Sequence, residues 1–205
     1  LYNEDCLIAM DRMIEDGVVV DVIITDPPYQ ITACKWDKLI PFDEMWLRLN
    51  KLIKPNGAIV LFGSEPFSSA LRMSNIKNYK YDWIWEKTRA CNFNSVKYQP
   101  LKMHENIIVF NKHRYYPIKE MKTGASLERT KYAYNSKKKS DHFKSEEKGF
   151  RSEDKYPNAI KKFNNQVGFH PTQKPILLME YLIRTYTNEN ELVLDFTMGS
   201  GTTGV

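Results

Sequence analysis

The stretch ITDPPYQI, residues 24–31, ends a hydrophobic run that begins at Val18. The run predicts a buried strand, which must stop at Pro27 because proline lacks the backbone N–H that a sheet ladder needs. A residue that precedes proline favours extended conformations, so we expect Asp26 to present its carboxylate at the carboxyl end of the strand. Open parallel sheets bind ligands at that edge. Asp26 is therefore a candidate site residue.

Helical and strand patterns alternate along the rest of the chain. Leu7, Met10 and Ile14 have helical spacing within residues 5–16, and a second helix is expected from Pro41 to a turn at residues 55–57. Further strands are expected at 58–62, 81–86, 106–110 and 192–196, and further helices at about 67–76 and after Pro175. Such alternation predicts an α/β fold, with a parallel sheet covered by helices on both faces.

A second tight turn follows the last expected strand, in DFTMGSGTTG at 195–204. Gly199 and Gly201 would let the backbone approach a ligand without side-chain obstruction. A nucleoside triphosphate would require the lysine of a phosphate-binding loop, and the turn contains no cation. A cofactor without phosphates fits better. The ends of the two strands can form one crevice if those strands are neighbours in the sheet.

Charge is unevenly distributed along the 205 residues, whose net charge is +5. Residues 112–162 contain 15 Lys and Arg against 7 Asp and Glu, so their local charge is +8, and the remainder carries −3. Aromatic residues alternate with these cations, and no helical or strand period is evident. The pattern is typical of a nucleic-acid-binding insertion, since phosphates need cations and unstacked bases need aromatic faces. A solvated loop is the alternative reading.

Other features limit the class of protein. No apolar run approaches the roughly 20 residues of a membrane helix, and the start does not resemble a signal peptide, so we expect a cytoplasmic protein. The three cysteines and four histidines lack the spacing of metal ligands, so no metal site is expected. Neither Leu1 nor Val205 resembles a natural terminus, and the chain is expected to be a truncated piece.

Six sequence blocks, in their order, resemble the beta class of S-adenosylmethionine-dependent DNA amino-methyltransferases. They are DPPY at 26–29, FGSEPF at 62–67, WIWEK at 83–87, HENIIVF at 104–110, HPTQKP at 170–175 and DFTMGSGTTG at 195–204. The resemblance implies a Rossmann-like, doubly wound and mostly parallel sheet with one antiparallel strand, plus an irregular basic insertion. It divides the chain into a catalytic part (1–111), a target-recognition insertion (112–168) and a cofactor-binding part (169–205).

The resemblance also implies roles for individual residues. Asp26, Pro27, Pro28 and Tyr29 match the catalytic motif: Asp26 and the Pro27 carbonyl would accept hydrogen bonds from the target amine, and Tyr29 would stack on the flipped base. The residues expected to bind S-adenosylmethionine are Asp5, Cys6, Asp26, Phe62, His170, Thr172, Gln173, Lys174, Asp195, Phe196, Thr197, Gly199, Gly201 and Thr202. The residues expected to contact nucleic acid are Lys87, Asn92, Phe93, Lys137, Lys138 and Lys139.

Several positions depart from the family pattern or allow another interpretation. Thr197 stands where the family usually has Phe, with Phe196 displaced by one residue, and the acid that would hold the cofactor ribose would lie after the last residue of the chain. His170 can equally be a packing or capping residue. Trp83 and Trp85 share one face of a strand and are expected in the core.

The activity implied by the resemblance is methyl transfer to the 6-amino group of adenine in a specific DNA sequence. Within the class, an acid at position 26 favours adenine, whereas enzymes that act on the 4-amino group of cytosine more often carry Ser there. Cytosine-N4 methylation and a non-catalytic nucleic-acid-binding subunit remain alternatives. The expected partners are DNA, a second copy of the chain and a cognate restriction endonuclease.

Overall fold

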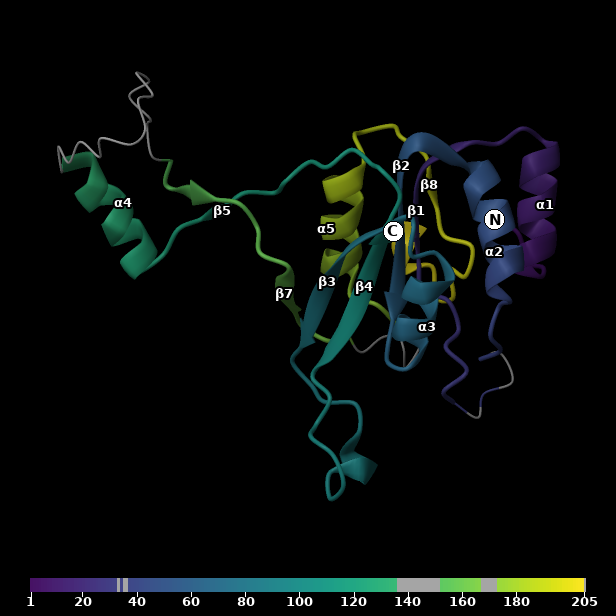
Figure 1. Ribbon diagram of the computed structural model, residues 1–205, viewed down its shortest axis with the longest axis horizontal. Coiled ribbons are helices and arrows are strands. Elements are labelled where there is room, and N and C mark those ends of the chain that lie inside the picture. Colours follow the sequence, from purple (N-terminus) through teal and green to yellow (C-terminus); the bar gives the residue numbers. More distant parts are fainter. Residues whose placement is uncertain (33, 35–36, 136–151, 167–172, 205) are drawn as a thin grey trace. The chain divides into compact units, whose positions relative to one another are not determined.

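The computed structural model describes residues 1–32, 34, 37–135, 152–166 and 173–204, and it comprises two units (Figure 1). The first unit contains residues Leu1–Tyr116 and Ala159–Val205, and the second contains Pro117–Asn158. Among the described residues, no helix is long and apolar enough to cross a membrane. In the same residues, no group of His, Cys, Asp and Glu has an arrangement that could hold a metal ion.

A six-stranded sheet forms the centre of the first unit. Across the sheet the strands are β7 (Ile160–Phe163), β3 (Tyr79–Lys87), β4 (His104–Phe110), β2 (Ile53–Gly63), β1 (Val20–Thr25) and β8 (Val193–Leu194). Strand β4 runs antiparallel to both of its neighbours, whereas the pairs β1–β2, β1–β8 and β3–β7 are parallel. The structure thus confirms a mostly parallel, doubly wound sheet with one antiparallel strand.

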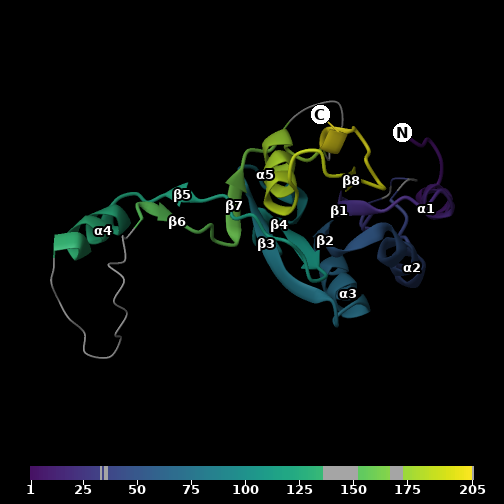
Figure 2. The same ribbon diagram turned by 90° about the horizontal axis from the view of Figure 1, so that it is seen from above.

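Helices cover both faces of this sheet (Figure 2). On one face are α1 (Cys6–Glu15), α2 (Phe42–Leu52) and α3 (Phe67–Ser74), and on the other is α5 (Ile176–Tyr186). Ile23 of β1 packs in the core beneath α1–α3, while its neighbours Val22 and Ile24 pack with α5 in the second core. A strand that is buried on both faces needs apolar residues at every position, which explains the continuous hydrophobic run before Asp26.

Most predicted elements agree with the structure to within about two residues at each end, and the largest difference lies at the start of β2. The expected turn at residues 55–57 is wrong, because β2 begins at Ile53, directly after α2, and these residues lie inside the strand. The register changes there, since Val20 pairs with Ile53 and Val22 pairs with Ala58. The last strand is shorter than the predicted 192–196, because β8 contains only Val193 and Leu194.

The basic insertion contains regular structure, contrary to the prediction. Its central part is the second unit, which holds α4 (Ala125–Asn135) and an antiparallel ribbon of β5 (Glu120–Met121) and β6 (Asp154–Lys155). The final part of the basic segment forms β7, which joins the edge of the main sheet beside β3. The second unit therefore begins later and ends earlier than the predicted insertion at 112–168.

Candidate active site

The ends of β1 and β8 lie side by side, because these two strands are parallel neighbours in the sheet. The hydroxyl of Thr25, the last residue of β1, donates a hydrogen bond of 2.5 Å to Asp195 Oδ1, just after β8. A second hydrogen bond joins the same two strand ends, because Thr197 Oγ1 donates to the backbone oxygen of Asp26 over 3.0 Å. The two strands are neighbours, as a shared crevice requires, and the DPPY loop contacts the glycine-bearing loop.

The carboxylate of Asp26 has two partners and retains contact with solvent. Its Oδ1 accepts a hydrogen bond from the Tyr29 hydroxyl, and its Oδ2 forms an ion pair with Lys174 Nζ. The Asp26 side chain is 28% exposed, whereas that of Lys174 is 9% exposed. Burial, together with the negative charge of Asp26, raises the pKa of the Tyr29 hydroxyl well above its ordinary value, so it remains a proton donor.

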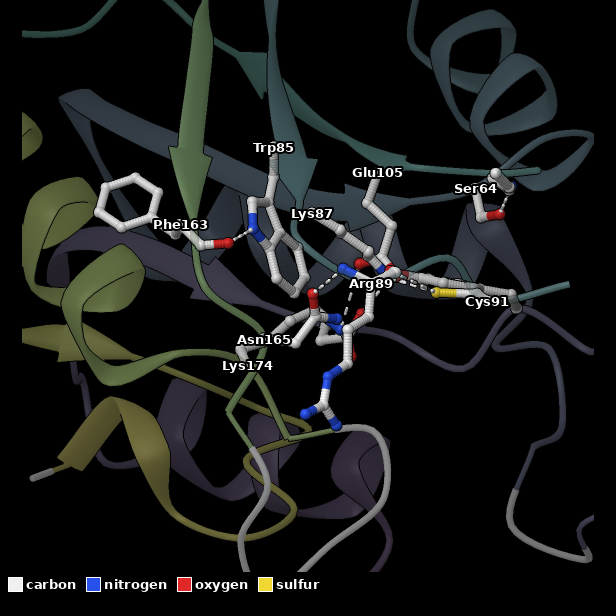
Figure 3. A network of polar contacts seen from close by, with 12 residues as sticks. Ser64, Trp85, Lys87, Arg89, Cys91, Glu105, Phe163, Asn165 and Lys174 are labelled. Atoms are coloured by element: carbon white, nitrogen blue, oxygen red, sulfur yellow. Dashed lines mark hydrogen bonds and ion pairs between the residues drawn. The ribbon is translucent and has the colours of Figure 1, made fainter. Parts of the chain in front are cut away.

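A row of alternating charges continues from Asp26 through Lys174 and Glu105 to Lys87, and the last three residues are labelled in Figure 3. Lys174 Nζ lies 3.5 Å from Glu105 Oε2, and Glu105 also pairs with Lys87. Burial opposes ionisation of Lys174, but the two carboxylates outweigh it and raise its pKa. Burial likewise opposes ionisation of Glu105, but the two lysines outweigh it and lower its pKa. Both shifts favour the charged forms of Lys174 and Glu105, so their ion pair persists at neutral pH.

The loop after β8 is built for a close approach of its backbone to a ligand. Gly199 and Gly201 have φ angles of +56° and +81°, which side-chain-bearing residues rarely adopt. A Cβ atom on Gly201 would have no heavy atom within 4 Å, so the space beside it is open. Asp195 braces this loop by accepting hydrogen bonds from Thr203 Oγ1 at 2.5 Å and from the Thr197 backbone N–H at 3.1 Å.

The groups around this loop fit a ligand that carries an amino acid and a sulfonium group. The loop offers backbone amides, hydroxyls and the carboxylate of Asp195, with no cation that would demand a phosphate. Burial raises the pKa of Asp195. Gln173 Oε1 is buried and has no hydrogen-bond partner among the described residues, so it is available as an acceptor.

The other residues predicted to bind the cofactor lie on several elements of the first unit. The ring centroid of Phe62 lies 5.1 Å from Lys174 Nζ, at the end of β2. Asp5 caps α1 by accepting a hydrogen bond of 2.8 Å from the Leu7 N–H, and Cys6 is the first residue of that helix. Phe196 packs against the core beneath α1–α3, and Thr202 is buried. His170 and Thr172 lie outside the described residues.

The residues predicted to contact nucleic acid are found in different environments. Lys87 is buried and paired with Glu105, so the structure places it inside the site instead of on a surface that faces phosphates. Asn92 spans a hairpin between β3 and β4, and Phe93 on the same hairpin is 63% exposed. Lys137, Lys138 and Lys139 lie outside the described residues. Trp83 and Trp85 are buried, as predicted.

Sequence reasoning did not single out Glu105, although it links both lysines of the site. Its only signal in the sequence is a charged residue near the start of a strand whose last four residues, 107–110, are apolar and buried. A charged residue near the start of a strand is ordinarily explained by exposure of the strand end to water, so this pattern does not indicate a functional role. Its importance becomes visible only from its contacts with Lys174 and Lys87.

A Rossmann-like sheet with a DPPY loop and a glycine loop at adjacent strand ends defines the class of S-adenosylmethionine-dependent amino-methyltransferases. Residues 20–205 match the family model N6_N4_Mtase, which is described as DNA methylase. The chain therefore belongs to the DNA methylase family. It is an S-adenosylmethionine-dependent DNA methyltransferase.

Relatives and solved structures agree with this assignment. Over 91% of its length the chain is 31% identical to the Type II methyltransferase M2.LlaDCHI of Lactococcus lactis subsp. cremoris, of which it covers 72%. Over its whole length it is 29% identical to the Type II methyltransferase M2.DpnII of Streptococcus pneumoniae, of which it covers 79%. The crystal structure of the M1.HpyAVI–SAM complex matches 99% of the chain with a TM-score of 0.65 and 28% identity, and 84% of that protein is covered.

Proposed function

We propose that the protein transfers the methyl group of S-adenosylmethionine to the 6-amino group of an adenine within a specific DNA sequence. The observation that carries this proposal is the position of the Asp26 carboxylate, which is partly exposed and lies beside the open glycine loop. An acid at this position of the motif favours adenine over cytosine in the class that the chain resembles. DNA is the substrate of the family.

The chemistry requires a stronger nucleophile than a free adenine amine. Its lone pair is delocalised into the aromatic ring, and two acceptors can draw the amine hydrogens out of the ring plane. Asp26 and the Pro27 carbonyl supply these acceptors in the proposal. When bound, S-adenosylmethionine supplies an activated methyl group on its sulfonium. The protein then contributes mainly alignment, which lowers a barrier by about 7–11 kcal/mol where the geometry is ideal.

Lys174 and Tyr29 act as positioning residues for Asp26 in this proposal. Each binds one oxygen of the Asp26 carboxylate and thereby fixes its orientation. A carboxylate oxygen has two lone pairs, so either oxygen can also accept a hydrogen bond from a substrate amine. The Tyr29 ring, which stacks on Phe67 with centroids 4.9 Å apart, would also border the flipped base. Stacking of this kind offsets part of the few kcal/mol that base extrusion costs.

The cofactor would lie along the loop after β8. Its methionine part would contact Asp195, Gly199 and Gly201, where the backbone is open. The block that contains His170, Thr172 and Gln173 would close over it, and Gln173 Oε1, which has no hydrogen-bond partner among the described residues, would be one contact. The other contacts in this proposal are Asp5, Cys6, Phe62, Phe196, Thr197 and Thr202.

The remaining parts of the proposal concern partners and organisation. Residues 112–168 would recognise the target sequence, because their excess of cations favours contact with phosphates. The relatives above are named Type II methyltransferases, which supports a role beside a cognate restriction endonuclease in the cytoplasm. Sedimentation of the protein with and without DNA would show whether two copies associate.

The base assignment is tested by incubating unmodified DNA with the protein and S-adenosylmethionine that carries a labelled methyl group. We expect mass spectrometry of the digested nucleosides to find the label in N6-methyladenine, and sequencing of the same DNA to map the target sequence. Labelled N4-methylcytosine as the sole product would refute adenine. DNA binding without any transfer would favour the non-catalytic subunit.

A matched variant tests the role of Asp26. Asp26→Ala should abolish transfer while DNA binding, measured by fluorescence anisotropy, remains close to that of the unsubstituted protein. An unchanged rate of transfer would refute the assignment of Asp26 as an acceptor.

A further inference from the structure

A hairpin at the edge of the active site is not used by the proposed chemistry. It comprises residues 88–103, which join β3 to β4, and it is called the β3–β4 hairpin below. Strand β4 lies between β3 and β2 and is antiparallel to both, so β3 runs in the same direction as β2 and β1. The hairpin therefore leaves the sheet at the same edge as Asp26, and it projects past the ends of the strands (Figure 1).

The base of the hairpin is tied to the active site. Asn165 Oδ1 accepts hydrogen bonds of 3.0 Å from the backbone N–H groups of Thr88 and Arg89 (Figure 3). The residue before the hairpin is Lys87, which pairs with Glu105 in the row of charges that leads to Asp26. The base of the hairpin is thus held at the edge of the sheet where Asp26 lies.

The two arms of the hairpin are also joined to each other. Asn92 Nδ2 donates to the Pro100 carbonyl oxygen over 3.0 Å, and Asn92 Oδ1 accepts from the Lys102 N–H over 2.6 Å. Lys102 Nζ donates to Ser64 Oγ on the loop after β2. These contacts brace the hairpin from inside, although few of its side chains are buried.

The surface of the hairpin combines exposed apolar groups with positive charge. Its exposed large apolar side chains are Phe93 (63% exposed), Val96 (53%), Tyr98 (89%), Leu101 (45%) and Met103 (38%). Residues 88–103 include three cations and no Asp or Glu. Apolar groups kept in water on a braced projection are typical of a binding surface. The uniform positive charge is complementary to a polyanion, whereas a second copy would bring the same cations into contact.

We propose that the β3–β4 hairpin enters the DNA duplex at the target base pair and that Phe93 and Tyr98 fill the gap that the extruded adenine leaves. This inference rests on the proposed function. An extruded base leaves its neighbours unstacked, and an aromatic ring can stack on every base regardless of sequence. Proteins that unstack DNA commonly do so with apolar side chains, and nearby cations contact the phosphates. The hairpin offers both kinds of group at the edge of the sheet where Asp26 lies.

The test compares two duplexes that carry the target sequence mapped above. One is fully paired, and the other has an abasic site opposite the target adenine, so that this base is already unpaired. Tyr98→Ala and Phe93→Ala should lower kcat/KM on the paired duplex by between about 5-fold and about 150-fold, the value of one stacked base. The loss on the abasic duplex should be much smaller, because the opening step is no longer needed.

Two further variants separate the loss of stacking from the loss of any exposed apolar side chain and from the loss of positive charge. Met73→Ala removes a side chain that is 69% exposed on α3, outside the hairpin, and should affect neither duplex. Lys97→Ala removes a cation from the hairpin and should reduce the slope of log K against log salt by about 0.9 on both duplexes. Circular dichroism confirms that each variant is folded.

Equal losses on the paired and abasic duplexes for Tyr98→Ala and Phe93→Ala would overturn the inference. Equal losses accompanied by a change of sedimentation coefficient would assign the hairpin to a contact between two copies instead. If the unsubstituted protein methylates neither duplex, the proposed function fails, and the hairpin inference fails with it. Methylation of both duplexes without a difference between the variants refutes the hairpin inference alone.

Discussion

Removal of the Lys174 charge should destabilise the protein more than loss of a surface ion pair would. Lys174→Met keeps the length of the side chain but leaves Asp26 and Glu105 with one cation, Lys87, in place of two. Breaking a buried pair by removal of one partner costs about 3–5 kcal/mol. Because the Asp26 side chain is 28% exposed, water screens part of this cost, and we expect about 3 kcal/mol.

Urea denaturation followed by circular dichroism measures this loss. With an m-value of about 2 kcal/mol/M, the midpoint should fall by about 1.5 M. The double variant Lys174→Met/Glu105→Gln removes one charge of each sign, so it should recover about 1–2 kcal/mol relative to Lys174→Met alone. A loss below about 1 kcal/mol for Lys174→Met, or strict additivity of the two substitutions, would refute the interpretation of these residues as a coupled buried network.

Three other outcomes are expected. Gly201→Ala should lower the free energy of unfolding by about 1–2 kcal/mol, because a side chain is strained at φ +81°, and should weaken binding of S-adenosylmethionine by isothermal titration calorimetry. Thr197→Val leaves the Asp26 backbone oxygen without its donor, which should cost about 1–3 kcal/mol and slow methyl transfer. Burial lowers the pKa of His113 below its ordinary value, so the unfolded state binds its proton more readily, and stability should fall as the pH drops below about 6.5. His113→Gln should remove that part of the pH dependence in urea titrations.

Matched controls exist for the Gly201 and Thr197 variants. Gly17 also has a positive φ and open space at its Cβ position, but it lies after α1, so Gly17→Ala should cost similar stability without weakening cofactor binding. Thr187 donates a hydrogen bond of 2.6 Å to a backbone oxygen of α5, and Thr187→Val should leave the rate unchanged. A Gly201→Ala variant with full cofactor affinity, or a His113→Gln variant with the original pH profile, would contradict the expected roles.

Local sequence patterns predicted much of the fold because the apolar positions that they mark are the positions that are buried in the structure. Helical spacing of apolar residues marked α1, α2 and α5, and proline marked the end of β1. The direction of β4 depends on which strands it pairs with, and the family resemblance indicated only that one strand of the sheet would be antiparallel. Helix α4 was missed because its surface is rich in charged and polar residues, which hides an apolar period.

The site itself was predictable only in part. Asp26 and the glycine turn have local signatures, namely a strand that ends in proline and a turn that needs positive φ. Lys174 was placed in the cofactor block by resemblance, but its contact with Asp26 joins residues 148 positions apart. The same holds for Glu105, whose partners come from separate elements. Contacts of this kind follow from the order of strands in the sheet, and no spacing in the sequence encodes them.

The central claim is that the loops after β1 and β8 bind the two reactants at one place. A crystal structure of the protein with S-adenosylmethionine tests it directly. We predict that the methionine part of the cofactor lies along Gly199 and Gly201, with its methyl carbon directed toward the carboxylate of Asp26. Electron density for the cofactor at another edge of the sheet, or a methyl carbon directed away from Asp26, would contradict the claim.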